Sequence, residues 1–596
     1  MAVRICEDQD RHVSYCGCRR YSFGGRLNIR RYNFVKVKNV KPGKTNFMTT
    51  KTNRHYDVII IGGGATGAGT ARDCAMRGFR TLLVEKFDFT AGATGRNHGL
   101  LHSGARYAVT DPESAQECIK ENMILKRIAK HCVDDTGGLF VTLPQDDIDY
   151  QSVFVKACVS AGINAEIISP EEAIQLEPSV NHDLIGAVRV PDGAIDPFRL
   201  TVANVVSARQ YGASILTYTQ VIGFEFAQNR VVGVKLRDNR NGEIWSEYAE
   251  VVVNASGIWG QHLARLVGVN VHMYPAKGSL LIFGHRINNV VINRCRKPAD
   301  ADILVPGDTI SVIGTTSSRI PYADIDNLEV TRDEVDLLVR EGALLSPVLA
   351  EARILRAYAG VRPLVADEND PTGRNISRGI VCLDHAKRDG VEGFVTITGG
   401  KLMTYRLMAE MATDVVAEKL DRKSACRTAT IPLPGSELDK AEEPFGKKAH
   451  IIQLSTEQKA AEERHGSLAE EIDFKTEYDE ALICECEQVS VGEINFAINK
   501  LHCENLINLR RRTRMGMGTC QGEMCACRAA GILVKHNRCA ERTLRDLSSF
   551  INERWKGMKP VAWGESLIEA QFMSWLYEGV CGLDKIATPL DKIDSK

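Results

Sequence analysis

The chain has 596 residues, too many for one ordinary core, and domains of ~100–200 residues predict roughly three to four of them. A hydrophobic content of 44% and a charged content of 25% are those of a globular protein, and no apolar run approaches the ~18 residues that span a bilayer. The 75 basic and 76 acidic residues give a net charge of −1, so the basic excess of a nucleic-acid-binding protein is missing.

The first residues of the chain do not share the periodicity of the rest. Residues 1–51 are rich in Arg and Lys and are expected to be a non-native or disordered extension, with translation beginning at Met48. An organellar presequence is the alternative, and Glu7, Asp8 and Asp10 argue against it. Since no secretory signal is recognisable, the 18 cysteines are expected to be free thiols or metal ligands.

A glycine-rich turn follows the first predicted strand. Residues 56–61 are apolar and β-branched enough to form a buried strand, and they run directly into a G-x-G-x-x-G sequence. Gly62 permits a tight turn, Gly64 lets the backbone approach a pyrophosphate, and Gly67 lets the next helix pack closely on the strand. This spacing predicts a dinucleotide-binding βαβ unit.

The helix and the second strand of that unit agree with the glycines. The helix is predicted over 65–78, and its N-terminal amides would point at the phosphates of the dinucleotide. The second strand, 80–84, ends at Glu85, whose carboxylate would accept hydrogen bonds from the adenosine ribose. The unit alone does not separate FAD from NAD.

Two later segments favour FAD. Val251–Gly257 is a strand that ends in a small-residue turn and resembles the returning motif of two-dinucleotide-binding flavin oxidoreductases. Thr398–Lys401 resembles the segment that closes over the flavin ring in that superfamily, and its helix, 402–419, would direct amide dipoles at the pyrimidine edge. The candidate cofactor residues are therefore Gly62, Gly64, Gly67, Glu85, Ala255, Gly257, Gly399 and Gly400.

Three blocks carry a more specific resemblance. His102–Tyr107 (HSGARY), Gly360–Leu364 (GVRPL) and Thr398–Arg406 (TGGKLMTYR) resemble the FAD-dependent glycerol-3-phosphate dehydrogenase family. Arg96–Tyr107 and Val305–Thr316, together with an added Cys-rich module, resemble the anaerobic enzymes of that family over about residues 52–590. The resemblance implies an enzyme that oxidises glycerol 3-phosphate to dihydroxyacetone phosphate, with hydride passing from C2 to the flavin N5.

The resemblance also indicates which side chains meet the substrate. Arg106, Arg362 and Lys401 match the substrate-binding positions of the family, and a phosphate dianion needs such cationic donors. His102 matches a histidine of the family and is the candidate base for the C2 hydroxyl. His98 is its rival, and His102 could instead orient the flavin or be a core residue.

A Cys-rich segment begins near residue 481. Cys484 and Cys486, and Cys520 and Cys525, form a C-x-C and a C-x4-C pair, and the arrangement resembles the bacterioferritin-associated-ferredoxin-like 2Fe–2S domain. Zinc and free thiols are the alternatives, although zinc sites more often use C-x2-C pairs. Between the pairs, the run Arg510–Arg514 is either a solvated face or a patch that docks an acidic partner or raises the cluster potential.

The predicted fold is α/β, with a Rossmann-type FAD-binding domain interleaved with a mixed-sheet substrate domain. The predicted parts are an oxidoreductase core (52–435), a connector (436–480), a cluster-binding domain (481–535) and a helical tail (536–596). By resemblance, the chain would bind partner subunits, reach quinone through them, and lie peripherally at the cytoplasmic face of the inner membrane.

Two other functions remain open from the sequence. An amine or 2-hydroxy-acid oxidase of the same fold would bind a carboxylate and needs fewer cations than Arg106, Arg362 and Lys401 supply. A non-enzymatic flavin protein that only transfers electrons would have an inactive pocket, and the intact matches at the three substrate segments argue against it.

Overall fold

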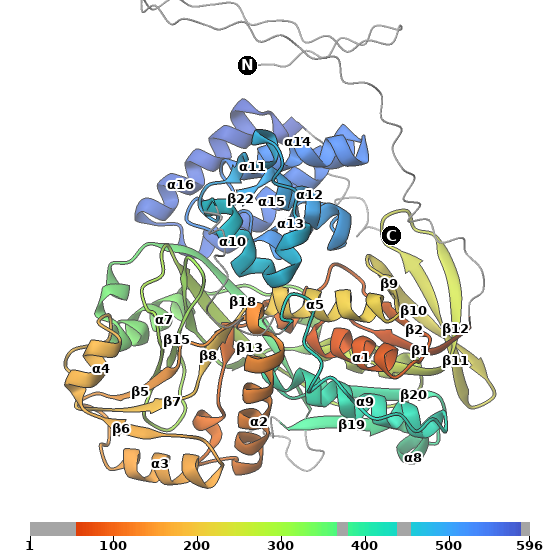
Figure 1. Ribbon diagram of the computed structural model, residues 1–596, viewed down its shortest axis with the longest axis horizontal. Helices are drawn as coiled ribbons and strands as arrows, with labels where there is room; N and C mark the ends of the chain where they lie inside the picture. Colours follow the sequence, from red (N-terminus) through yellow and green to blue (C-terminus); the bar gives the residue numbers. More distant parts are fainter. Residues whose placement is uncertain (1–54, 366–378, 438–454, 586–596) are drawn as a thin grey trace, which may run out of the picture.

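The computed structural model describes residues 55–365, 379–437 and 455–585. Two sheets with their helices form the lower part of the molecule in Figure 1, and a helical module made by the C-terminal part of the chain lies above them. The expectations for residues 1–51, including a start at Met48, lie outside the described residues.

The first sheet contains the predicted βαβ unit. Its strands run in the order β10-β11-β12-β1-β2-β9, and β20 and β19 continue from β12. Their bounds are His55–Ile61 (β1), Thr81–Val84 (β2), Ser214–Leu216 (β9), Thr219–Ala227 (β10), Arg230–Asp238 (β11), Ile244–Asn254 (β12), Ile380–Asp384 (β19) and Phe394–Gly399 (β20). Because β1 is parallel to β2 and to β12, and β12 is parallel to β20, the carboxyl ends of these four strands lie at one edge.

Both faces of β1 are buried, as its apolar sequence predicts. Val58 and Ile60 pack in the core that includes α1 (Ala65–Met76), whereas Ile59 packs in the core on the opposite face. Helices α5 (Pro197–Gln210) and α9 (Tyr405–Lys419) flank α1. A strand covered on both sides has no need for polar alternation, which is why this segment reads as a continuous apolar run.

The second sheet is built from segments that interrupt the first. Its order is β17-β13-β16-β15-β14-β5-β7-β6, with β18 also paired to β13. Its strands are Gly138–Thr142 (β5), Glu166–Ile168 (β6), Gly186–Val190 (β7), Met273–Phe283 (β13), Val291–Arg294 (β14), Ile303–Pro306 (β15), Ser311–Gly314 (β16), Ser318–Arg319 (β17) and Ile354–Val365 (β18). Since β14 and β5 are parallel and the other pairs are antiparallel, the sheet is mixed, and the predicted interleaved fold is confirmed.

The C-terminal part of the chain folds around one hydrophobic core. Its helices and strands are Thr456–His465 (α10), Glu477–Glu480 (α11), Leu482–Cys484 (β21), Val489–Ser490 (β22), Val491–Lys500 (α12), Leu506–Thr513 (α13), Cys525–Asn537 (α14), Ala540–Met558 (α15) and Gly564–Ser574 (α16). Ala461 from α10, Leu509 from α13 and Phe550 from α15 belong to the same buried cluster. The boundaries expected at residues 480 and 535 therefore fall inside one packed unit, here called the C-terminal module (455–585).

Buried ion pairs attach this module to the rest of the molecule. Arg512, from α13, donates to both carboxylate oxygens of Asp88 at 2.6 and 3.0 Å, and Arg511 donates to the same carboxylate at 3.0 Å. Burial alone would raise the pKa of Asp88, but the two arginines outweigh it and lower that pKa to about 2. Asp88 is therefore ionised at neutral pH and holds α13 against the segment that follows β2.

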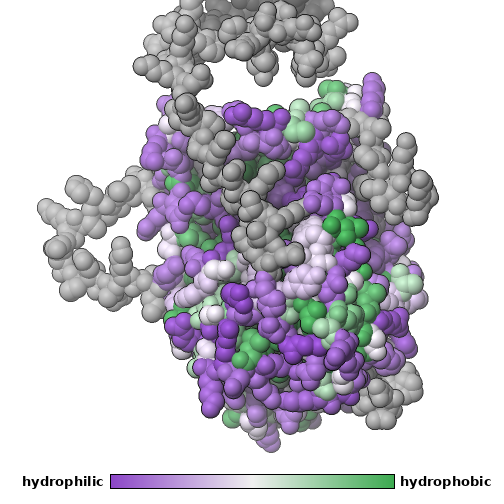
Figure 2. All heavy atoms as spheres, turned by 90° about the vertical axis from the view of Figure 1, so that its right-hand side faces the viewer, coloured by the Kyte–Doolittle hydropathy of each residue, from purple (hydrophilic) through white to green (hydrophobic). Residues whose placement is uncertain are grey.

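The surface of the described residues has a mixed character. Figure 2 shows a face on which hydrophilic side chains predominate and hydrophobic ones form smaller groups between them. None of the helices in the described part of the chain has both the length and the apolar character that crossing a membrane requires.

The first prediction concerns the contact between α1 and β1. A Cβ added at Gly67 would lie 1.8 Å from the carbonyl oxygen of Gly62, and backbone cannot move away without disrupting the turn. We expect Gly67→Ala to lower the free energy of unfolding by about 1–3 kcal/mol or more, measured by urea denaturation.

Gly531→Ala is the matched control. Gly531 lies within α14, and its added Cβ would meet no atom within 4 Å. This substitution should raise the free energy of unfolding by about 0.5–1 kcal/mol, because alanine favours the helix. Equal effects at the two positions would contradict the close approach of helix and strand at Gly67.

Candidate flavin, substrate and cysteine sites

The predicted cofactor residues gather at one edge of the first sheet. Gly62 follows β1, Glu85 follows β2, Ala255 follows β12, and Gly399 ends β20. Ligands of open α/β sheets bind at the carboxyl ends of the parallel strands, where neighbouring connections diverge. The parallel pairing thus brings together segments that are up to about 340 residues apart in the sequence.

Glycines of the motif lie where the backbone or a side chain of another segment comes close. Gly62 has a φ of 114°, and a Cβ there would be 2.6 Å from the carbonyl oxygen of Ala255. At Gly64, which precedes α1, an added Cβ would meet only the Thr94 side chain, at 3.0 Å from Oγ1. The hydroxyl of Thr94 also accepts a hydrogen bond from the amide of Ala65 at 3.1 Å, so the start of α1 lies close to this side chain. A helix N-terminus without a side chain at Gly64 fits a pyrophosphate.

Glu85 lies at the end of β2 and faces the glycine turn. Its Oε2 accepts a hydrogen bond from the amide of Gly63 at 2.5 Å, and its Oε1 accepts one from Phe87 at 2.8 Å. Burial raises the pKa of Glu85, and these amides act in the opposite direction. The carboxylate is thus fixed in place, and each oxygen retains a lone pair for a ribose hydroxyl.

The segment around residue 400 also fits a ligand that lies over it. Gly399 and Gly400 have φ values of 75° and 63°, and a Cβ at Gly399 would be 2.4 Å from the carbonyl oxygen of Gly379. The Oγ1 of Thr398 is buried without a hydrogen-bond partner among the described residues. A buried hydroxyl normally has a partner, so this orphan indicates a missing polar ligand. These observations fit FAD at this edge of the sheet.

Arg106 and Arg362 approach a common region from different elements. Arg362, on β18, donates to the carbonyl oxygen of Thr316 at 3.0 Å and to the hydroxyl of Thr315. Arg106 donates from Nη2 to Asp302 at 3.2 Å, and its Nη1 is buried without a partner in the described structure.

The segments that the two arginines contact lie side by side, because the amide of Ala301 donates to the carbonyl oxygen of Thr315 at 3.1 Å. Both charges also act on His98. Burial, then the charges of Arg362 and Arg106, lower the pKa of His98 to about 3. The same two arginines also act on Asp300, whose pKa burial raises. The two cations therefore converge, and one donor of Arg106 is still available to an anion.

Lys401 and His102 both lie beside the ring of Tyr107. The Nζ of Lys401 lies 4.7 Å from the centroid of the Tyr107 ring, and the His102 ring lies 5.1 Å from it. The amide of Gly104 donates to Nδ1 of His102 at 3.1 Å, so the proton of the neutral imidazole is on Nε2. In this state Nε2 is a donor, which favours binding of a substrate oxygen over removal of its proton.

Several neighbours of these residues were not identified from the sequence. Asp302 holds Arg106 and also pairs with Arg296 at 2.7 Å, and Asp300 lies within the field of both site arginines. Nothing near these aspartates in the sequence marks them. Tyr107 belongs to the sequence block that contains His102. An aromatic residue five positions after a candidate base was the one feature of the sequence that could have indicated its place in the site.

The four predicted cluster cysteines come together in the C-terminal module. The thiols of Cys484, Cys525, Cys520 and Cys486 lie close enough together that each changes the pKa of the next in this order. Cys486 and Cys525 lower the pKa of Cys520, and the amides of Gly522 and Met524 add to the effect. All four are free cysteines.

The thiol arrangement is not that of a compact mononuclear centre. Among the residues that the structure describes, no group of three or more His, Cys, Asp or Glu side chains is placed so that it could hold a metal ion. The thiols nevertheless are neighbours in the order Cys484, Cys525, Cys520 and Cys486. Backbone amides directed at thiolates are typical of iron–sulfur ligands.

The run Arg510–Arg514 is not a solvated face. Arg512 and Arg514 are buried, and Arg510 and Arg511 are partly buried. Arg514 contacts Glu487 at 3.0 Å and Asp196 at 3.5 Å, so this run joins the C-terminal module to the oxidoreductase core.

Comparison with known proteins agrees with the fold and with FAD as the cofactor. Residues 57–406 match the family model described as FAD dependent oxidoreductase. The chain is 58% identical to the A subunit of the anaerobic glycerol-3-phosphate dehydrogenase of Escherichia coli K12, with 90% of this chain and 99% of that protein covered. It is 42% identical to the A1 subunit of the Haloferax volcanii enzyme of the same name, with 89% and 91% covered.

A solved structure supports the fold. The glycerol-3-phosphate dehydrogenase from Bacillus halodurans, complexed with FAD, superposes with a TM-score of 0.61 at 20% identity and covers 86% of this chain and 97% of its own. Taken with the glycine turn, the four converging strand ends and the orphaned Thr398 hydroxyl, these matches show that the chain belongs to the FAD dependent oxidoreductase family and, within it, to the anaerobic glycerol-3-phosphate dehydrogenase A subunits.

Proposed function

We propose that the chain oxidises sn-glycerol 3-phosphate to dihydroxyacetone phosphate with FAD as the cofactor. The observation that carries this proposal is that Arg106 and Arg362 contact neighbouring segments, with Nη1 of Arg106 buried and without a partner in the described structure. A phosphomonoester dianion supplies the acceptors that such a pair of guanidinium groups requires. The names of the relatives point to the same substrate.

A bound flavin would supply the acceptor for the hydride that leaves the C2 carbon of the substrate. Arg106 and Arg362 bind the phosphate, and Asp302 fixes the orientation of Arg106. Lys401, packed on Tyr107, brings a further positive charge to the substrate. Because the reacting carbon must lie at a fixed distance from the ring, this anchoring of the phosphate contributes to rate as well as to affinity.

His102 holds a proton at Nε2 in this arrangement. We propose that Nε2–H donates to the C2 oxygen and orients the C–H bond, with Gly104 fixing the tautomer. The proton of the C2 hydroxyl then passes to water as the hydride leaves C2. His98, whose pKa is lowered to about 3, is neutral at physiological pH and is too weakly basic to be an efficient proton acceptor there.

Two other functions are less well supported. An amine or 2-hydroxy-acid oxidase would place a carboxylate at this site, and a monoanion compensates two convergent arginines and Lys401 less completely than a phosphate dianion does. An inactive protein that only transfers electrons would not need Arg106 to be positioned by Asp302 with a donor left available.

We propose that Cys484, Cys486, Cys520 and Cys525 hold a 2Fe–2S cluster. The four neighbouring thiols, and the amides of Gly522 and Met524 near Cys520, support four ligands of an anionic cluster. Such a centre takes electrons one at a time, so it suits an exit route from a two-electron flavin.

Partner subunits are proposed to complete the route to quinone at the cytoplasmic face of the inner membrane. The relatives are named as subunits. On α16 and the turn that follows it, Ile568, Phe572 and Trp575 are 67%, 47% and 62% exposed, respectively. A cluster of large apolar side chains in water is typical of a protein interface, so this end of the C-terminal module is the proposed docking surface.

Arg362→Gln tests the phosphate site. Loss of a charge-assisted hydrogen bond costs about 1.5–3 kcal/mol, so kcat/KM for glycerol 3-phosphate should fall about 10- to 100-fold, mainly through KM, while FAD remains bound. Arg189→Gln, at an exposed arginine of β7 in the same sheet, is the control and should behave as wild type. An unchanged KM in Arg362→Gln would contradict the proposed phosphate contact.

His102→Asn distinguishes a donor from a base. If Nε2–H orients the substrate, the rate of flavin bleaching at saturating substrate should fall about 10-fold, the scale of one hydrogen bond, and its dependence on pH should stay the same. A fall of about 100- to 10,000-fold with loss of an ionisation in the pH profile would instead identify His102 as the base. Stopped-flow absorbance at several pH values makes the measurement.

Cys520→Ser tests the cluster. The variant should lose its iron (~2 atoms per chain in wild type) and the electron paramagnetic resonance signal after dithionite reduction, while FAD stays bound. Cys527→Ser, at an exposed cysteine of the same segment, should keep both. Stoichiometric zinc without iron in the wild-type protein would refute the assignment.

A further inference from the structure

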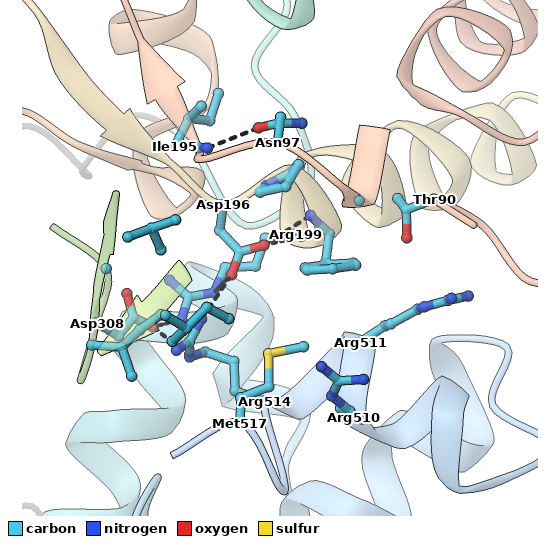
Figure 3. Close-up of a pocket in the computed structure, with 18 of the residues that line it drawn as sticks. Thr90, Asn97, Ile195, Asp196, Arg199, Asp308, Arg510, Arg511, Arg514 and Met517 are labelled. Carbon is cyan, nitrogen blue, oxygen red and sulfur yellow. Dashed lines mark hydrogen bonds and ion pairs between the residues drawn. The ribbon is translucent and has the colours of Figure 1, made fainter. Parts of the chain in front are cut away.

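A large cavity lies between the oxidoreductase core and the C-terminal module. Its volume is about 1550 Å³, and it is lined from the core by β18 and the segment 95–99, and from the module by α13 and α15. Figure 3 shows Arg510, Arg511 and Arg514 projecting into this region opposite Asp196 and Asp308. Of the residues predicted for the flavin, substrate and cysteine sites, His98, the rival candidate base, lines this cavity, whereas Arg106, Arg362, Lys401 and the four cysteines do not.

At one end of the cavity the positive charges are compensated. Arg514 contacts Asp308 at 3.1 Å and Glu487 at 3.0 Å, and Arg199 pairs with Asp308 and, at 3.7 Å, with Asp196. Dashed lines in Figure 3 join side chains in the group of Arg199, Arg514, Asp196 and Asp308. Arginines and carboxylates are matched here, so this end needs no further anion.

Three other arginines that line the cavity lack such partners. Arg356 (β18) and Arg554 (α15) are only 6% and 1% exposed, and Arg510 (α13) is partly buried. Within the described residues, Nε and Nη1 of Arg356, Nε of Arg510 and all three guanidinium nitrogens of Arg554 have no hydrogen-bond partner. In Figure 3, Arg510 carries no dashed line, in contrast to Arg514 beside it.

The surroundings of these three arginines do not neutralise them. Burial, followed by the charges of the other arginines, lowers the pKa of both Arg510 and Arg554 well below the usual value. Glu553 is the acidic side chain whose charge opposes this at Arg356 and Arg510, and Arg96 adds a further positive charge at Arg356. At Arg554 the opposing groups are the thiols of Cys525 and Cys520, which accept no hydrogen bond from its guanidinium in the described structure. An unpaired buried charge costs several kcal/mol, so a cluster of three calls for a compensating anion.

We propose that Arg356, Arg510 and Arg554 form a binding site for a phosphate-bearing ligand, separate from the substrate site. Phosphate fits because guanidinium forks bind its oxygens in pairs, and one polyvalent anion can accept from all three side chains. The cavity exceeds the ~300–1,000 Å³ usual for a small-molecule site, so the rest of a larger phosphorylated molecule has room beside the arginines.

The position of the site suggests what its occupant does. Arg356 belongs to the core, whereas Arg510 and Arg554 belong to the C-terminal module. Without an anion, Arg356 repels Arg510 and Arg554 across this boundary. An anion that binds all three would attract both sides and hold the module against β18, the strand that also carries Arg362.

Calorimetric titration of the FAD-loaded, full-length protein with inorganic pyrophosphate tests the proposal. Wild type should bind about one equivalent at this site, and Arg510→Met should weaken that binding at least 10-fold. The same variant, without ligand, should melt at the same temperature as wild type or higher, because an uncompensated buried charge is removed. Arg356→Met replaces Arg510→Met if the latter does not retain the flavin spectrum.

Two further variants separate this site from other phosphate-binding surfaces. Arg286→Met is the matched control, since Arg286 lines the same cavity but pairs with Asp134 at 2.9 Å, and it should bind pyrophosphate as wild type does. Arg362→Gln, which impairs the proposed substrate site, should also retain this binding. Absence of binding in wild type, or binding that Arg362→Gln abolishes and Arg510→Met leaves intact, would overturn the proposal without bearing on substrate oxidation.

Discussion

The close approach of α1 to β1 is the constraint on which the rest of the molecule depends. Gly67 lets the helix start within contact of the Gly62 carbonyl, and Gly62 in turn lies against the backbone of Ala255. With side chains at these positions, the first turn of α1 could not lie at the edge where β1, β2, β12 and β20 all end. The cofactor site depends on the close approach of the backbone at Gly62, Gly67 and Ala255, where a side chain on either glycine would collide with a neighbouring carbonyl group.

Polar groups left without partners mark where this protein binds other molecules. The Thr398 hydroxyl lies at the flavin edge, Nη1 of Arg106 in the proposed phosphate site, and the guanidinium groups of Arg356 and Arg554 in the cavity below the C-terminal module. Paired groups surround each of them, such as Asp302 beside Arg106. Since burial without a partner is costly, these orphans are better explained by ligands than by stability.

The sequence predicted the local parts of this arrangement well. The βαβ unit follows from residues close together in the chain, since turn glycines and apolar runs have fixed spacings, and the predicted strand at 56–61 is β1. Convergence of residues 255–257 and 398–401 on that unit depended on family resemblance, because parallel pairing between distant strands leaves no local pattern. The roles of Arg106, Arg362, Lys401 and His102 are proposals that began from the family resemblance.

Other features had no usable signal in the sequence. Asp302 lies 196 positions from Arg106, and only the tertiary fold brings them together. Residues 456–465 are polar enough to read as a connector, yet Ala461 is fully buried in the core of the C-terminal module. The run Arg510–Arg514 reads equally well as a solvated face, and its burial depends on Asp88, Asp196 and Glu487, which lie far away in the sequence.

The most direct measurement is anaerobic mixing of the purified, FAD-loaded protein with sn-glycerol 3-phosphate while the flavin absorbance is recorded. The account predicts that the flavin band bleaches with saturable dependence on substrate, and that glycerol, which lacks the phosphate that Arg106 and Arg362 are proposed to bind, is far less effective. A band that stays unchanged with glycerol 3-phosphate would contradict the proposed oxidation.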